Sequence, residues 1–130
     1  MSRRPFAAIS FAVLVAAAHP AVAAEFKPFD RATFDAAQKA GRPILVEVNA
    51  WWCPVCASQT KTIRSTVVTP AYAKLLILRI NYDKQKSDWQ AFGVQKQSTL
   101  IAFKGGRELG RVSYVTDKAQ IQALLATTTR

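Results

Sequence analysis

Two segments of the chain are almost continuously apolar and rich in β-branched residues. They are residues 44–48 (ILVEV) and 75–81 (LLILRIN), and each is interrupted by a single charge, Glu47 in the first and Arg79 in the second. Short, nearly unbroken apolar runs are typical of strands that are covered on both faces. The pattern therefore predicts two buried central strands, each with one charged side chain that needs a partner.

A third apolar segment leads into a predicted hairpin. Residues 99–104 (TLIAFK) are followed by Gly105 and Gly106 and then by a second segment at 108–115. A pair of glycines between two such segments favours a tight turn that joins antiparallel strands.

Helix signals fall between these strands. A helix at 31–40 is expected from a capping aspartate and a stopping glycine, and three more begin near a proline, a serine and a threonine. The expected helix-terminal residues are Asp30, Gly41, Pro54, Ser87 and Thr116. Helices that alternate with buried strands predict an α/β fold, a mixed central sheet with helices on both faces.

The segment before residue 25 has a different composition. Two arginines near the start are followed by an uncharged run, residues 6–18, and by small residues up to Ala24. This arrangement is typical of a signal peptide, so we expect removal of residues 1–24, a single domain at 25–130 and a periplasmic location. The apolar run is shorter than the roughly 20 residues that span a bilayer, which leaves a retained N-terminal anchor as the weaker alternative. Residues 2–6 also resemble a twin-arginine signal.

The net charge of +10 excludes few classes of function by itself. Basic residues are spread along the chain, without the basic runs and interleaved aromatic residues of a nucleic-acid groove, so nucleic acid is not an expected partner. At most the charge favours acidic partners or an anionic membrane surface.

The candidate chemistry lies in the two cysteines. Cys53 and Cys56 stand where the strand at 44–48 gives way to the helix that begins near Pro54. Unpaired N–H groups and the positive end of the helix dipole stabilise a thiolate there. We therefore expect Cys53 to be ionised, outermost and accessible, and to attack a partner disulfide. Cys56 would lie deeper and resolve the mixed disulfide.

Other uses of a cysteine pair fit less well. A zinc site needs four ligands, and the lone histidine, His19, lies in the expected signal peptide. A c-type haem site needs histidine directly after the second cysteine, where Ala57 stands. A structural disulfide would close too short a loop to constrain the unfolded chain strongly. We therefore expect no cofactor, and keep binding of a soft metal such as Cu(I) as the alternative function.

The segment from Trp52 to Cys56 resembles the Trp-Cys-x-x-Cys active site of the thioredoxin superfamily. Glu47, six residues before the first cysteine, and Arg79 on the next strand resemble the family's buried acid and its basic partner. The resemblance implies a thioredoxin-like three-layer fold and a monomeric protein-disulfide oxidoreductase that acts on protein thiols and disulfides. A membrane electron donor and an apocytochrome are candidate partners, and reduction is slightly favoured as the direction.

The resemblance also suggests roles for single residues. Glu47 would take the Cys56 proton, directly or through water, with Arg79 in support, because burial raises the pKa of a carboxyl group. A purely structural ion pair is the alternative. Trp51 and Trp89 are expected to fill the core or the layer beneath the surface. The expected client-binding residues are Trp52, Pro54, Val55, Gln97, Ser98 and Thr99.

Ser98 departs from the family pattern, which has a cis-proline immediately before the Thr-Leu strand. A cis bond before serine costs about 2.5–4 kcal/mol, so we expect this peptide bond to be trans. Three outcomes are open: an active enzyme with a reshaped groove, a weak enzyme, or an exposed dithiol that holds metal.

Overall fold

The computed structural model describes residues 14–17 and 23–130, so most of the expected signal peptide, residues 1–24, lies outside the described residues. Within those ranges, no helix is both long enough and apolar enough to cross a bilayer.

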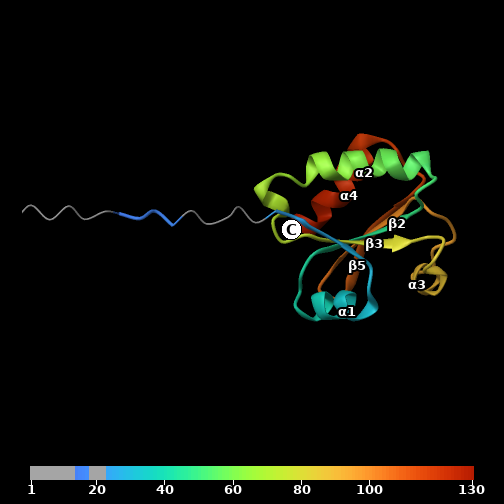
Figure 1. Ribbon diagram of the computed structural model, residues 1–130, viewed down its shortest axis with the longest axis horizontal. Coiled ribbons are helices and arrows are strands. Elements are labelled where there is room, and N and C mark those ends of the chain that lie inside the picture. The colour runs from blue at the N-terminus through green and yellow to red at the C-terminus, as the bar shows by residue number, and fades with distance from the viewer. Residues whose placement is uncertain (1–13, 18–22) are drawn as a thin grey trace, which may run out of the picture.

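A five-stranded sheet forms the centre of the domain (Figure 1). Its order is β1-β3-β2-β4-β5; β1, β3 and β2 run parallel, and β4 and β5 run antiparallel to their neighbours. The mixed sheet is confirmed. The strands are β1 (Glu25–Pro28), β2 (Ile44–Asn49), β3 (Leu76–Asn81), β4 (Thr99–Lys104) and β5 (Arg107–Ser113).

Helices cover both faces of this sheet, which confirms the three layers (Figure 1). On one face, α2 and α4 supply Ile63 and Leu125 to a core cluster; on the other, α1 and α3 supply Phe34 and Trp89 to a second cluster. The helices are α1 (Arg31–Lys39), α2 (Pro54–Thr66), α3 (Lys86–Ala91) and α4 (Lys118–Ala126), with two short 3₁₀ turns, η1 (Pro70–Tyr72) and η2 (Thr127–Thr129).

Strand β2 shows how the sheet positions the site. Alternate residues of a strand point to opposite faces. Val46 and Val48 join the cluster under α1 and α3, whereas Leu45 joins the cluster under α2 and α4. Glu47 therefore shares the Leu45 face and lies beneath α2, the helix that carries the cysteines.

Two predicted helix caps are wrong. Asp30 caps α1 as expected, accepting a hydrogen bond from the Thr33 N–H. In contrast, α4 is capped by Asp117, whose carboxylate reaches the N–H three residues ahead, and the predicted Thr116 lies one residue too early. Ser87 lies inside α3, which begins after Gln85 without a side-chain cap.

The sheet also differs from the prediction at both ends. Strand β1 was not predicted, because this four-residue edge strand has no apolar run of its own. The last strand was predicted to reach Val115 but ends at Ser113. Tyr114, the next residue, has a φ of 60°, and this left-handed conformation takes the backbone out of the extended geometry of a strand.

Candidate active site

Cys53 is the N-cap residue of α2. Its extended backbone precedes Pro54 at the first helical turn, and its Sγ accepts a hydrogen bond from the Cys56 N–H at 3.1 Å. The first turn of a helix leaves such N–H groups without backbone partners, so the sulfur takes the place that an oxygen occupies in an ordinary cap. The predicted position of the pair at the mouth of a helix is confirmed.

Both cysteines are buried, which corrects the expectation of an exposed Cys53. Cys53 is 4% exposed and Cys56 2% exposed. Cys53 belongs to a small buried cluster with Ala50 and Cys56, against which Val55 and Tyr82 pack. It still lines a surface hollow of about 300 Å³, together with Trp51, Thr60 and other residues, which is the opening next to the pair.

Ser98 lies between the two sulfurs. Its Oγ is 3.0 Å from the Sγ of Cys53 and 3.0 Å from the Sγ of Cys56, and the residue is 0% exposed. No cis peptide bond occurs among residues 14–17 and 23–130, so the bond before Ser98 is trans, as predicted.

The backbone of Ser98 is held on both sides. Its N–H donates to the carbonyl of Val48 at 2.8 Å, and its own carbonyl accepts from the Tyr114 N–H and from Gln59 Nε2, each at 3.0 Å. Its φ is 63°, in the left-handed region that non-glycine residues seldom occupy. These bonds fix the place from which the hydroxyl reaches the sulfurs.

The surroundings move the two thiol pKa values in opposite directions. Burial raises the pKa of Cys53, but hydrogen bonds from the Cys56 thiol, the Ser98 hydroxyl and the Cys56 N–H outweigh it, so the pKa of Cys53 is lowered. Burial, and then the hydrogen bond to Cys53, raise the pKa of Cys56. Cys53 is therefore the more readily ionised thiol of the pair, and Cys56 the less readily ionised one.

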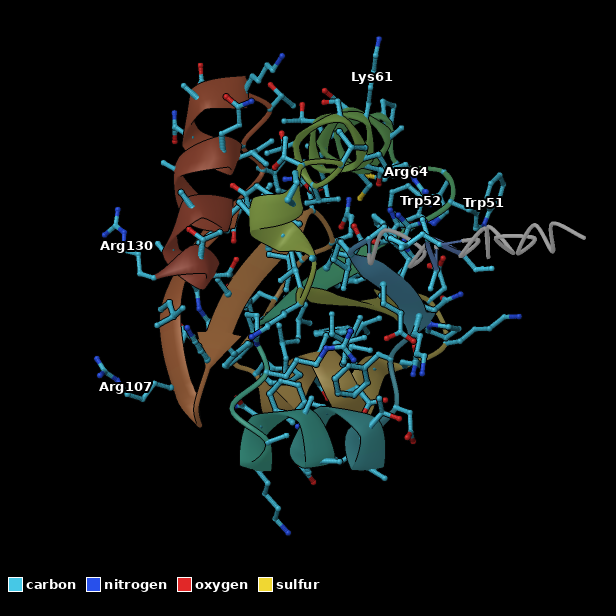
Figure 2. All side chains as sticks on the ribbon, turned by 90° about the vertical axis from the view of Figure 1, so that its left-hand side faces the viewer. Trp51, Trp52, Lys61, Arg64, Arg107 and Arg130 are labelled. Carbon is cyan, nitrogen blue, oxygen red and sulfur yellow. The ribbon has the colours of Figure 1, made fainter. Side chains whose placement is uncertain are left out.

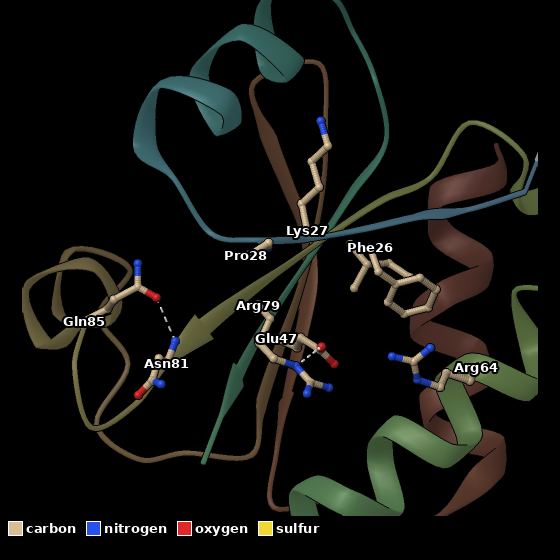
Figure 3. Close-up of a pocket in the computed structure, with 9 residues that line it drawn as sticks. Phe26, Lys27, Pro28, Glu47, Arg64, Arg79, Asn81 and Gln85 are labelled. Atoms are coloured by element: carbon tan, nitrogen blue, oxygen red, sulfur yellow. Dashed lines mark hydrogen bonds and ion pairs between the residues drawn. The ribbon is translucent and has the colours of Figure 1, made fainter. Parts of the chain in front are cut away.

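Glu47 and Arg79 form the predicted ion pair. They stand side by side in the parallel register of β2 and β3, and Arg79 Nε donates to Glu47 Oε1 at 2.5 Å. Arg79 Nη2 also donates to Thr60 Oγ1 at 2.9 Å, one helical turn beyond Cys56. The pair lines a cavity of about 350 Å³ between β1 and α2, with Phe26 and Arg64 nearby (Figure 3). The Glu47 carboxylate is thus hydrogen-bonded to Arg79, whereas both sulfurs lie within hydrogen-bonding distance of Ser98.

The three tryptophans occupy different depths. Trp51 is 89% exposed, so its expected place in or near the core is wrong; it lies in the turn before Cys53, where its ring meets solvent. Trp52 is also exposed, and its indole N–H donates to the Asp83 carboxylate at 3.1 Å. Trp89 is buried as predicted and stacks on Tyr82. Figure 2 shows Trp51 and Trp52 projecting from the same edge of the molecule.

The comparisons with known proteins agree with this geometry. The family model described as thioredoxin matches residues 25–127. The chain belongs to the thioredoxin family. It is 30% identical over 95 residues to a thioredoxin of Alicyclobacillus acidocaldarius, covering 73% of this chain and 90% of that one. It is also 30% identical over 102 residues to the protein disulfide-isomerase erp38 of Neurospora crassa, covering 68% of this chain but 28% of that one.

Solved structures give the same result. Trxlp from Edwardsiella tarda EIB202 is 37% identical, with a TM-score of 0.75 over 78% of this chain and 98% of that one. The thioredoxin of Malassezia sympodialis has a TM-score of 0.72 at 19% identity, over 83% of this chain and 93% of that one, and shows the shared fold. This thioredoxin-family chain is a thiol:disulfide oxidoreductase with Cys53 and Cys56 close together.

The expected client-binding residues of this thioredoxin-family domain divide into two groups. Trp52 and Pro54 are exposed and Val55 is half-buried, so their side chains are open to a client. The side chains of the other three, Gln97, Ser98 and Thr99, are buried. Their contacts are internal: Gln97 Nε2 donates to the Tyr114 hydroxyl, and Thr99 Oγ1 donates to the Lys96 carbonyl.

Sequence reasoning missed Gln59. Its side-chain amide donates to the carbonyls of Ser98 and Val115, and the residue is 3% exposed. Gln59 thereby ties α2 to the start of β4 and to the segment after β5. The available signal was a polar residue three positions after Cys56, on the face of α2 that turns toward the sheet.

Proposed function

We propose that this chain is a periplasmic thiol:disulfide oxidoreductase that reduces disulfides in client proteins through Cys53 and Cys56. One observation carries the proposal: Cys53 caps α2 and accepts a hydrogen bond from the Cys56 N–H at 3.1 Å, and both sulfurs lie 3.0 Å from one hydroxyl. The hydrogen bonds lower the pKa of Cys53 despite its burial, whereas burial raises the pKa of Cys56. Cys53 therefore ionises more readily and is the attacking sulfur, and Cys56 resolves the mixed disulfide.

The exchange takes place in two displacements. The Cys53 thiolate attacks one sulfur of the client disulfide; an S–S bond forms to Cys53, and the other client sulfur leaves with the electron pair and takes a proton. Cys56 then loses its proton and attacks the Cys53 sulfur. The Cys53–Cys56 disulfide forms, and the second client sulfur leaves as a thiolate that is protonated. Two electrons thus pass from the cysteine pair to the client; because Cys53 reacts as a thiolate, one of the two protons gained by the client is balanced by that lost from Cys56 and the other comes from solvent.

Glu47 is our candidate for the group that receives the Cys56 proton, through water. Arg79, its ion-pair partner, lines the same 300 Å³ hollow as Cys53, which gives a polar route between the carboxylate and the sulfurs. Arg79 would hold the carboxylate in place during this transfer.

The direction and location rest on separate support. Thioredoxins are more reducing than protein disulfide-isomerases, at about −270 mV against about −180 mV, and the match to a thioredoxin covers 90% of that protein. The N-terminal pattern supports export. In the periplasm the oxidised pair would need an electron donor in the membrane, and an apocytochrome is a fitting client because its cysteines must be reduced. We expect the domain to act as a monomer.

The test is a trapping experiment. In Cys56→Ala the first displacement still occurs but the second cannot, so a mixed disulfide between Cys53 and the client should accumulate in periplasmic extracts and identify the client. Cys53→Ala is the matched control and should trap nothing. An assay of disulfide reduction with a dithiol donor should show turnover for the wild type and none for either variant. Equal trapping by both variants would contradict the proposed roles.

Carriage of Cu(I) is the second candidate function. It is favoured by one observation: two buried sulfurs converge on one oxygen, and thiolates are ligands that Cu(I) prefers. Among the described residues, no three or more His, Cys, Asp or Glu side chains gather, so the two thiolates would be the main ligands. Stoichiometric copper after anaerobic loading and gel filtration, together with absent turnover, would favour the carrier.

A further inference from the structure

A single buried hydroxyl contacts both reacting sulfurs. The Oγ of Ser98 lies 3.0 Å from each of them. A hydroxyl has one proton to donate and two lone pairs with which to accept. In the reduced protein the hydroxyl is placed to donate its proton to the Cys53 sulfur, and the bond is strongest when that sulfur is a thiolate. The Cys56 sulfur lies at the same distance, so one hydroxyl is within hydrogen-bonding distance of both sulfurs.

Closure of the disulfide weakens the hydrogen bonding between this hydroxyl and the two sulfurs. Cys53 then carries no charge, and Cys56 has no proton to donate, while a sulfur without charge is a weak acceptor. Ser98 is 0% exposed, so water does not reach the hydroxyl to replace what is lost. A buried polar group that loses its partners destabilises the state in which this happens. The hydroxyl thus favours the dithiol form over the disulfide form.

Hydrogen bonds to its backbone hold Ser98 in place beside the sulfurs. Ser98 is held through its N–H by Val48 and through its carbonyl by Gln59 and Tyr114. The Gln59 amide comes from the same helix as the two cysteines, so the distance between α2 and Ser98 is fixed.

We propose that Ser98 raises the reduction potential of the Cys53/Cys56 pair by stabilising its dithiol form, so that the protein is a weaker reductant than the same protein without this hydroxyl. The inference rests on the proposed exchange chemistry. A residue that shifts the reduction potential also shifts the equilibrium of disulfide exchange between the protein and its client. Ser98 lies just before β4, outside the Cys-x-x-Cys segment itself.

The test is a redox titration of the full-length protein against glutathione. In Ser98→Ala we expect the disulfide form to be favoured about tenfold more at equilibrium, from the loss of a hydrogen bond to a charged sulfur, which is about 30 mV more negative for a two-electron couple. Ser98→Gly also lacks the hydroxyl but suits the positive φ, and it should shift the equilibrium in the same direction. Ser113→Ala removes an exposed hydroxyl on the adjacent strand that bonds to Thr99, and should leave the potential unchanged.

A second measurement separates the hydroxyl from general damage to the fold. Titration of thiolate absorbance should give a higher pKa for Cys53 in both Ser98 variants than in the wild type. Unchanged potentials in Ser98→Ala and Ser98→Gly, or shifts of opposite sign, would overturn the role of Ser98 while leaving the exchange chemistry intact. A wild-type pair that forms no reversible disulfide would overturn the proposed function instead.

Discussion

Two polar side chains lie beneath the helix that carries the cysteines, and they differ in what they contact. Glu47 comes from the middle of β2 and is 3% exposed; Ser98 comes just before β4 and is 0% exposed. The carboxylate is engaged by Arg79, whereas the hydroxyl is engaged by both sulfurs. Glu47 can be identified from its position six residues before Cys53 and from the family resemblance. The residue that contacts both sulfurs directly is Ser98, which lies more than 40 positions further along the chain.

Removal of Arg79 should have the largest effect. The Glu47 side chain is 5% exposed, whereas the Arg79 side chain is 38% exposed. Arg79→Ala would leave a buried carboxylate without its partner and should lower the free energy of unfolding by about 3 kcal/mol, the low end for buried pairs because Arg79 reaches solvent. Urea denaturation of the reduced protein measures this.

Glu47→Gln is the matched variant for that stability measurement. It leaves Arg79 with access to water, so we expect a much smaller loss, and the double variant Glu47→Gln/Arg79→Ala should recover part of the stability lost in Arg79→Ala. A loss below about 1 kcal/mol in Arg79→Ala would mean that solvent already screens the pair.

The same Glu47→Gln variant tests the proton transfer. If the carboxylate receives the Cys56 proton, turnover should fall on the order of 100-fold, the low end for general acid–base groups, because the contact is indirect. The pH dependence of turnover should change as well. Glu108→Gln removes an acid from an exposed ion pair with Arg111 and is the control. Turnover and pH profile equal to the wild type would assign Glu47 a structural role and leave Ser98 as the polar group that acts on the sulfurs.

The lowered pKa of Cys53 predicts a smaller effect than the loss of Arg79 or Glu47. It concerns how the reactivity of Cys53 and the stability of the reduced protein depend on pH. The rate of alkylation by iodoacetamide should fall as the pH falls through the pKa of Cys53, with a midpoint below that of a free cysteine. By linkage, the stabilisation of the reduced protein is fully present above the unfolded thiol's pKa and is lost as the pH falls through the lower folded value.

Mass spectrometry locates the iodoacetamide label and so compares the alkylation rates of the two cysteines. Cys53 should be modified several-fold faster than Cys56 near neutral pH, roughly in line with their thiolate fractions. A midpoint equal to that of free cysteine would show that burial wins over the hydrogen bonds from Cys56 and Ser98.

The sequence predicted those parts of the site that depend on local pattern. The unbroken apolar runs identified β2 and β3, and Pro54 after a strand placed the cysteines at the mouth of α2. These features depend on neighbours in the chain, so a single sequence contains the information. The ion pair between Glu47 and Arg79 followed from one charge in each buried strand together with the family resemblance.

The sequence did not predict what depends on contacts between distant segments. Tyr82, from the segment after β3, packs against the buried cluster that contains Cys53, and the Ser98 contact arises from the antiparallel pairing of β2 with β4. The sequence marked Ser98 as unusual but gave no distance from it to the sulfurs. The exposure of Trp51 was also missed. Aromatic residues are often buried, but Trp51 lies in the turn before α2, where its ring is open to solvent.

Asp83 offers the smallest and last test, because it is a third polar group near the site but lies on the outer side. It accepts the Trp52 indole N–H at 3.1 Å in an exposed setting. Since exposed contacts contribute little, Asp83→Asn should change the free energy of unfolding by less than about 0.5 kcal/mol and leave the reduction potential at the wild-type value. Glutathione titration beside Ser98→Ala makes the comparison direct. A shift in Asp83→Asn as large as that in Ser98→Ala would mean that charge outside the pair, rather than the buried hydroxyl, sets the balance between dithiol and disulfide.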